Sequence, residues 1–366
     1  MIARHAGWIF ALWACVPGPP HLAAQDKAAI SPCPPSRYAI SSPTYQVVNI
    51  FNALTADSAS TPIRSLAGPN TSLCSPRDLA TDDAGRLYVM SRHVVTVYQR
   101  GATEDGMPIR SIAVADVGSN GALGMDVDRQ GNVYVVGDGG VRVFAPTTDE
   151  DGPPIRVING PATTLDQIRD VVVDSRGDIY VVSQGTSWRD VGPSVSVFRP
   201  DAEGNAAPIR VITGPNTLLR VPISLAVGRG DTLYVLNSFG MGKYGTSFIT
   251  VTVYAPRVAG AVEPVRSIIV TGGRHSSGGG LGLIWPTGIA VDDRGAVYLA
   301  NYWSHGVVAV FAPGANGPVR PQRLVYPRWA DTTKDSRDLG AVGVAIGPAD
   351  ELFVAASPQP AGFTMR

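Results

Sequence analysis

The chain has 366 residues, with 30 Lys and Arg against 30 Asp and Glu, so its formal net charge is zero. This balance argues against nucleic acid or an acidic membrane surface as the partner. Only 16% of the residues are charged, while Gly numbers 41 and Pro 30. Such a composition is typical of a chain rich in turns and poor in helix.

The first residues have the pattern of an export signal. A short basic lead, "MIARHAG", precedes the apolar run "WIFALWACV", which is too short to span a bilayer, and small residues follow in "PGPPHLAAQ". We expect residues 1–24 to form a signal peptide cleaved near Ala24. The alternative is a lipoprotein anchored through Cys15, although Trp13 makes a poor lipobox. Either way we expect a periplasmic or extracellular protein, with no transmembrane span in the rest of the chain.

A Pro-rich leader, residues 25–44, separates this signal from a single domain over residues 45–357, and residues 358–366 form a short tail. Export makes disulfides possible. If Cys15 is removed, Cys33 and Cys74 remain as a pair, and a bridge between them would attach the leader to the folded domain. Two free thiols are the alternative.

One hairpin pattern recurs six times in the domain. Each copy has an apolar strand, a turn of the type Asp-x-x-Gly and a second strand that an aromatic residue begins. These aromatic residues are Tyr88, Tyr134, Tyr180, Tyr234, Tyr298 and Phe353. In the fourth and sixth copies the turn is reversed, as Gly228–Asp231 and Gly347–Asp350.

Two further patterns follow each of the first five hairpins. The first is Val-x-Val-aromatic, as in Val95–Tyr98, whose alternation indicates a strand with one buried face. The second is Pro-x-Arg before an apolar run, as in Pro108–Arg110. A repeat of roughly 50 residues with four strands, here called A to D, is typical of a propeller blade.

The two ends of the domain complement each other. "VNIF" (Val48–Phe51) and Pro62–Arg64 are strands C and D without A and B, whereas Gly343–Ala356 is A and B without C and D. The sequence therefore predicts an all-β, six-bladed β-propeller of four-stranded blades, with the closing blade shared by N- and C-terminal strands. We interpret Pro and Arg on strand D, the outer edge, as protection against edge-to-edge pairing.

The segments "GIAVDDRGAVYLAN" and "VAVFAPGANG" resemble NHL-repeat six-bladed propellers of the secreted, bacterial type, and the resemblance extends from about Val48 to Ala356. It implies the fold and leaves the function open, because that family includes binding modules, scaffolds and a few enzymes.

All four Trp residues outside the signal lie in loops expected on the face where strands A begin and strands B end. They are Trp188, Trp285, Trp303 and Trp329, and Tyr302 adjoins one of them. Exposed aromatic rings on one face suit a ligand with apolar surfaces. The alternative is that each Trp only covers its own blade.

A second candidate site is the mouth of the central channel. Asp78 and Asp170 come at the start of strand A, and Asp126 is expected to point inward as well. With Asn237 and Asn301 these oxygens could hold Ca²⁺ or another divalent cation. The chain is similar in architecture to gluconolactonase-like propellers, which place a metal there with a Glu ligand, but no Glu stands at a matching position. Turn capping or ion pairs with Arg77 and Arg169 are the alternative role of these aspartates.

We therefore expect an exported, monomeric binding module that recognises a small molecule, a glycan or a protein through its loop-borne Trp residues, with no required cofactor. The alternative function is a metal-dependent hydrolase, lactonase or lyase that uses the mouth carboxylates. No catalytic Cys/His pair or Gly-x-Ser-x-Gly motif occurs in the sequence.

Overall fold

The computed structural model describes residues 46–114, 117, 121–186, 191–239, 248–271, 283, 285–302, 306–328 and 339–358. All of them belong to one unit of the chain, Pro32–Arg366. The predicted signal peptide, the leader, Cys15 and Cys33 lie outside the described residues, as do Trp188, Trp303 and Trp329. The described residues contain no helix with the length and apolarity that a membrane crossing needs.

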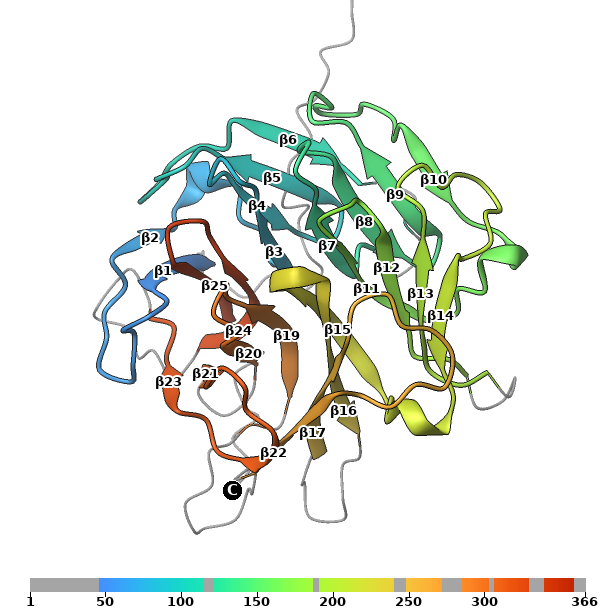
Figure 1. The fold of residues 1–366 in the computed structure, drawn as a ribbon. Helices are drawn as coiled ribbons and strands as arrows, with labels where there is room; N and C mark the ends of the chain where they lie inside the picture. Colours follow the sequence, from blue (N-terminus) through green and yellow to red (C-terminus); the bar gives the residue numbers. More distant parts are fainter. Residues whose placement is uncertain are drawn as a thin grey trace, which may run out of the picture. The chain divides into compact units, whose positions relative to one another are not determined.

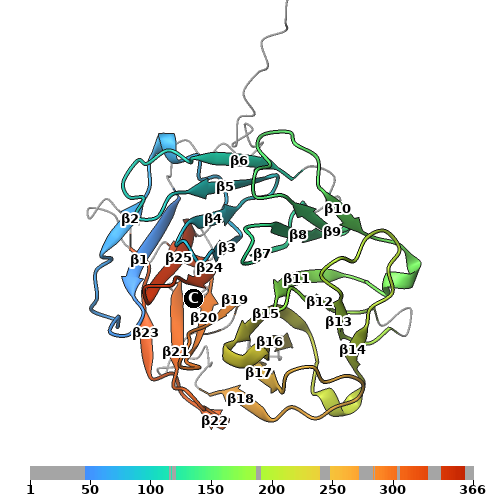
Figure 2. The same cartoon turned by 45° about the horizontal axis from the view of Figure 1, so that its top comes forward.

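The described strands form six small antiparallel sheets, which are the blades of a β-propeller (Figures 1 and 2). Blade 1 comprises β3 (Asp78–Thr81), β4 (Leu87–Met90), β5 (Val94–Tyr98) and β6 (Arg110–Ala113). Blade 2 comprises β7 (Gly124–Val127), β8 (Val133–Gly137), β9 (Gly140–Phe144) and β10 (Arg156–Ile158). Blade 3 comprises β11 (Ile168–Val173), β12 (Ile179–Ser183), β13 (Ser194–Phe198) and β14 (Arg210–Thr213).

The remaining blades follow the same order from strand A to strand D. Blade 4 comprises β15 (Pro222–Gly228), β16 (Thr232–Phe239), β17 (Phe248–Tyr254) and β18 (Arg266–Val270). Blade 5 comprises β19 (Pro286–Val291), β20 (Val297–Asn301), β21 (Val307–Phe311) and β23 (Arg323–Val325). Blade 6 comprises β24 (Leu339–Ile346), β25 (Glu351–Pro358), β1 (Val47–Asn52) and β2 (Arg64–Leu66).

Blade 6 confirms the predicted composite closure. Strand β25 pairs antiparallel with β1 from Val47 opposite Ala356 to Asn52 opposite Glu351. The innermost strands contact one another in a complete ring, in the order β3, β7, β11, β15, β19 and β24 and back to β3 (Figure 2). The prediction of an all-β, six-bladed propeller is therefore confirmed.

The hydrophobic core of the described residues is divided among the contacts between neighbouring blades. Six apolar clusters each combine residues of two adjacent blades, and the cluster between blades 6 and 1 includes Phe353 and Tyr98. The prediction that strand C buries only one face is wrong, because every residue of β5, β13 and β21 is buried. Each blade packs between two others, so both faces of its middle strands lose contact with water.

The predicted Asp-x-x-Gly turns are closed by the aromatic residue at the second position of strand B. In blades 1, 2, 3 and 5 the Tyr hydroxyl donates to the turn aspartate, at 3.0 to 3.3 Å. The same carboxylates accept backbone N–H groups, for example from Asn132 to Asp128 at 2.8 Å. These bonds explain why Asp and Tyr recur together in the sequence.

The outer edge of strand D is not bare. In blades 1, 2, 3, 4 and 6 a short segment of the next blade, between its strands C and D, pairs in parallel with this edge, as Glu104 does with Leu66 and Gly204 with Ile158. In blade 4 this segment is the extra strand β22 (Gly317–Val319). The interpretation of Pro-x-Arg as protection of a free edge is therefore wrong. Several of these arginines instead link blades, as Arg323 does when it donates to the Ala56 carbonyl at 2.7 Å.

Candidate ligand-binding face

The connections from D to A and from B to C emerge together on one face of the propeller, which we call the loop face. This follows from the antiparallel sheets, because strand A begins where strand B ends. The opposite face carries the A-to-B turns and the C-to-D connections. The two faces present different chemistry.

A cavity of about 560 Å³ lies on the loop face over blades 1 to 3. Its charged lining residues are Arg77, Arg92, Asp138 and Arg169, and we call it the arginine cavity. Arg77 precedes β3, Arg92 lies between β4 and β5, and Arg169 lies in β11. The other lining residues in the described part of the chain are Leu123, Gln167 and Ile168.

Aromatic side chains lie on the loop face over blades 4 and 5. Trp285 is 53% exposed and immediately precedes β19. Phe239 and Phe248 end β16 and begin β17, where their rings stack with centroids 5.4 Å apart. Phe248 is 57% exposed, so this pair presents apolar surface to solvent at the edge of the blade.

The other described aromatic candidate, Tyr302, is only half-buried, and its surroundings include the backbone of β24. A Cβ placed on Gly340 would lie 2.3 Å from the Tyr302 ring, so the ring occupies the space that this glycine leaves. The Tyr302 N–H donates to the Trp285 carbonyl at 3.0 Å. Tyr302 thus fixes the loop that carries Trp285.

Asn237 and Asn301 are buried beneath the loop face, where each binds the backbone of a D-to-A connection. The Asn237 Oδ1 accepts the Arg220 N–H at 3.1 Å, and the Asn301 Oδ1 accepts the Trp285 N–H at 2.8 Å. Asn301 ends strand B of blade 5, and Asn237 lies two residues before the end of strand B of blade 4. Both use the amide oxygen to fix the incoming D-to-A connection. Their geometry supports a structural role at the base of the loops.

The three candidate aspartates line one cavity in the central channel, of about 240 Å³. Each carboxylate accepts its own next N–H and one N–H of the next blade: Asp78 accepts Met125 at 2.9 Å, Asp126 accepts Val173 at 2.7 Å and Asp170 accepts Leu225 at 2.8 Å. The Ser224 hydroxyl also donates to Asp170, at 2.7 Å. The carboxylates therefore join the innermost strands of blades 1 to 4.

The same burial makes these carboxyl groups hard to ionise. Burial raises the pKa of Asp126 to about 7 and that of Asp170 to about 6. Burial, followed by the charge on Asp170, raises the pKa of Asp78 well above its usual range. Gly124 leaves the space that Asp170 occupies, because a Cβ there would lie 2.3 Å from its Oδ1.

This donor set does not fit a divalent metal of the kind that gluconolactonase-like propellers imply. The aspartate oxygens accept backbone N–H groups, and the oxygens of Asn237 and Asn301 accept the loop backbone. Within the described part of the chain, no group of three or more His, Cys, Asp or Glu side chains has metal-binding geometry.

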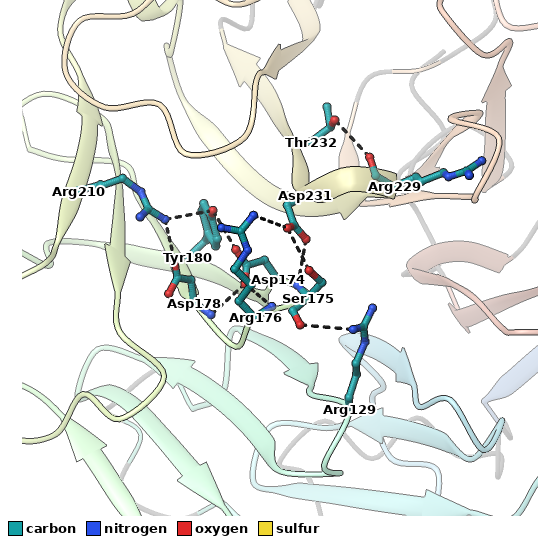
Figure 3. A network of polar contacts seen from close by, with 10 residues as sticks. All are labelled: Arg129, Asp174, Ser175, Arg176, Asp178, Tyr180, Arg210, Arg229, Asp231 and Thr232. Carbon is teal, nitrogen blue, oxygen red and sulfur yellow. Dashed lines mark hydrogen bonds and ion pairs between the residues drawn. The ribbon is translucent and has the colours of Figure 1, made fainter.

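A third cavity, of about 320 Å³, lies among the A-to-B turns of the opposite face. Figure 3 shows the polar network beside it, in which Asp231 of blade 4 reaches the turn of blade 3. Asp231 accepts the N–H and the hydroxyl of Ser175, both at 3.0 Å, and pairs with Arg176 at 3.3 Å. These groups satisfy one another between two blades.

Comparisons with known proteins support the fold. No protein-family model matches the chain, and no curated protein matches its sequence. A gluconolactonase from Xanthomonas campestris superposes with a TM-score of 0.51 at 15% identity, covering 86% of this chain and 96% of that chain. The calcium structure of a family AA12 carbohydrate-active enzyme from Trichoderma reesei gives a TM-score of 0.48 at 12% identity, covering 80% and 94%. The likeness to the gluconolactonase shows a propeller fold and nothing finer.

The structure thus separates the predicted site residues. Asp78, Asp126 and Asp170 meet in the channel, whereas Trp285 and Tyr302 belong to the loop face. Sequence reasoning did not identify the arginine cavity or the Phe239–Phe248 pair. One signal was available, because Arg77 and Arg169 occupy the same position of the repeat, directly before a strand A aspartate. The predicted Cys33–Cys74 bridge stays a prediction, since Cys33 lies outside the described residues.

Proposed function

We propose that this protein is an exported, monomeric binding module that takes its ligand on the loop face. The observation that carries the proposal is the exposure of Trp285, whose backbone is fixed by Asn301 while 53% of the residue faces solvent. An exposed Trp whose backbone is already fixed loses less conformational entropy when a ligand covers it. Phe239 and Phe248 add apolar surface on the neighbouring blade.

The ligand class that fits this surface is a small molecule, glycan or peptide with an apolar face. The likeness to a sugar-lactone enzyme gives a reason to place glycans first in a screen. The alternative, a metal-dependent hydrolase, lactonase or lyase, has less support. Its proposed ligands, the channel aspartates, already accept hydrogen bonds from the neighbouring blades.

The proposal is tested by a thermal-shift screen of glycans and peptides, with Ca²⁺ and a chelator as separate arms. A ligand at 100 times its dissociation constant stabilises the native state by about 2.7 kcal/mol, which raises the melting temperature measurably. For a ligand found in this way, Trp285→Ala should weaken binding about tenfold or more and leave the melting temperature of the free protein nearly unchanged.

The matched control is Met107→Ala, which removes a side chain of a residue that is 72% exposed on the opposite face. It should affect neither binding nor melting. Equal affinity in Trp285→Ala and wild type would overturn the proposal. A large loss of stability in Trp285→Ala would show that the ring is part of the core and would overturn it as well.

A further inference from the structure

We propose that the arginine cavity binds an anionic group of the ligand, a carboxylate, sulfate or phosphate held by Arg77, Arg92 and Arg169. The inference rests on the proposed function, because it assigns a chemical class to ligands of the same loop face. It depends on different residues from those over blades 4 and 5.

The first support is the way in which the fold presents these arginines. Arg169 lies at a β-bulge, where the pairing of β11 with β12 shifts between Ile168 and Asp170. A bulge re-aims the side chain of its extra residue. Asp170 thus enters the channel, whereas Arg169 is exposed and lines the cavity above it.

The same bulge recurs in blades 4, 5 and 6, where its residues are Ile223, Thr287 and Val342. The corresponding residues of blades 1 and 2 are Arg77 and Leu123, which also line the cavity. Among these six positions only blades 1 and 3 carry a charge, and both charges are positive. Charge at this position is therefore confined to the blades that surround the cavity.

The second support is the order imposed on Arg77 and Arg92. The Arg77 Nη1 donates to the Ala122 carbonyl at 3.0 Å, and the Ala122 N–H donates to the Arg92 carbonyl at 3.0 Å. Ala122 thus fixes the side chain of Arg77 and the backbone of Arg92 to the connection that enters blade 2. The guanidinium of Arg77 is positioned before a ligand arrives, which lowers the entropy cost of binding.

The third support is electrostatic. Among the lining residues that the structure describes, three arginines and Asp138 carry a formal charge of +2, although the whole chain is neutral. Burial and then the charge on Arg92 lower the pKa of Arg77, and burial followed by the charges on Arg92 and Arg77 lowers the pKa of the adjoining His93. Arg77 and Arg92 therefore lie close enough for their charges to interact, and an anion is favoured over a cation beside them.

The chemistry of arginine defines the ligand group. A guanidinium presents paired N–H donors that match the oxygens of a carboxylate, sulfate or phosphate. Arg92 and Arg169 are exposed and so accessible, and Gln167 adds a neutral amide to the wall. A volume of about 560 Å³ accommodates a group larger than a single ion, such as an acidic sugar.

The test is isothermal titration of the protein with sodium sulfate, sodium phosphate and glucuronate, at an ionic strength held constant with sodium chloride. We expect saturable binding of at least one of these probes. Arg92→Gln and Arg169→Gln should each raise the dissociation constant about tenfold, which is the loss of affinity expected for one charge-assisted hydrogen bond. The double variant should raise the dissociation constant further. Preference for glucuronate over sulfate would identify a carboxylate as the natural group, and the reverse preference would identify an oxyanion.

The matched control is Arg199→Gln, an exposed arginine between β13 and β14 on the opposite face. It removes the same charge and should leave the dissociation constant unchanged. Equal weakening by Arg199→Gln would overturn the inference, because it would show only a general charge effect. Unchanged binding in the double variant, or no saturable binding of any probe, would overturn it too.

The two proposals fail separately. If a ligand from the screen loses affinity in Trp285→Ala but not in the arginine double variant, the loop face binds ligands without the anion site. If the arginine variants lose affinity and Trp285→Ala does not, the anion site stands and the role assigned to the aromatic surface is wrong.

Discussion

Two opposite effects act on the pKa of the Asp126 carboxyl group. It accepts N–H groups from Val127 and Val173, which favour the ionised form, but the surrounding protein removes part of its hydration. Burial prevails and raises its pKa to about 7. The group therefore stabilises the fold through its bonds while its charge opposes folding at neutral pH.

This balance predicts a dependence of stability on pH. The carboxyl of Asp126 has a pKa of 3.8 when unfolded and about 7 when folded, so the native state binds more protons between these values. The stabilisation is complete below the unfolded pKa and is lost as the pH rises through about 7, by up to about 1.4 kcal/mol per pH unit. Asp170, with a pKa of about 6, adds to the same trend.

Melting temperatures measured from pH 4.5 to 8 test this prediction. The wild type should lose stability across this range, and Asp126→Asn should show a flatter profile on a lower baseline, because its amide cannot accept both N–H groups. Asp293→Asn, an exposed position in an A-to-B turn, is the control and should follow the wild type. A profile of Asp126→Asn parallel to the wild type would contradict the assignment.

At this scale the sequence predicted which carboxylates approach the channel but not what they bind. Asp78 and Asp170 could be located because they start strand A in a repeated pattern. Their partners, the N–H groups of Met125 and Leu225, belong to the next blade. A repeat pattern describes one blade at a time, so contacts between blades were not accessible from it.

The A-to-B turns illustrate the same limit for whole elements. In four blades the aspartate begins the turn and Gly ends it with φ between 77° and 87°. In blades 4 and 6 the aspartate ends the turn instead, with φ of 61° at Asp231 and 55° at Asp350. Each then reaches the arginine in the turn of the preceding blade, Arg176 or Arg294. The reversed turns, visible in the sequence, thus mark connections between blades.

These two reversed turns predict different effects of the same substitution. Asp231→Gly restores the residue found in the regular turns and relieves the positive φ, but it removes the acceptor of two bonds from Ser175. Because Asp231 is buried, we expect a net destabilisation of about 1–3 kcal/mol. Asp350→Gly removes only an ion pair between side chains 39% and 48% exposed, which is worth about 1 kcal/mol or less.

Urea unfolding of the two variants measures the difference. If Asp231→Gly were as stable as the wild type or more so, relief of the positive φ would outweigh the lost bonds between the blades in the free energy of unfolding. A cost for Asp350→Gly equal to that for Asp231→Gly would show that burial of the pair does not matter.

For the whole molecule, the ring depends on strands from the two ends of the domain. The sequence predicted this closure because each end lacked the two strands that the other end supplies. The parallel pairing of strand D with the next blade was not predicted, since its partners, such as Glu104 and Gly204, lie in segments without strand periodicity. The sequence therefore predicted contacts between distant segments where these segments are recurring strands. It did not predict them where single residues outside strands form the pairing.

Deleting residues 343–366 should abolish cooperative folding. The truncation removes β25 and half of β24, so β1 loses its partner from Val47 to Asn52. The apolar clusters on both sides of blade 6 are exposed at the same time. Loss of the sharp thermal transition in circular dichroism is the expected result. A truncated protein that melts as the wild type does would show that five blades are self-sufficient. Removal of residues 359–366 alone, which lie beyond β25, is the control and should leave melting unchanged.

The composite blade also sets the timing of synthesis. Strand β1 leaves the ribosome before any other described strand, yet β25, its partner in the ring, is made last. At translation rates of about 5–20 residues per second, the roughly 300 residues between them take about 15–60 seconds to produce. During that interval one side of β1 has unbonded backbone groups, which another nascent chain could capture. The cell's chaperones therefore have to keep β1 from pairing with other chains until β25 is made and the ring can form.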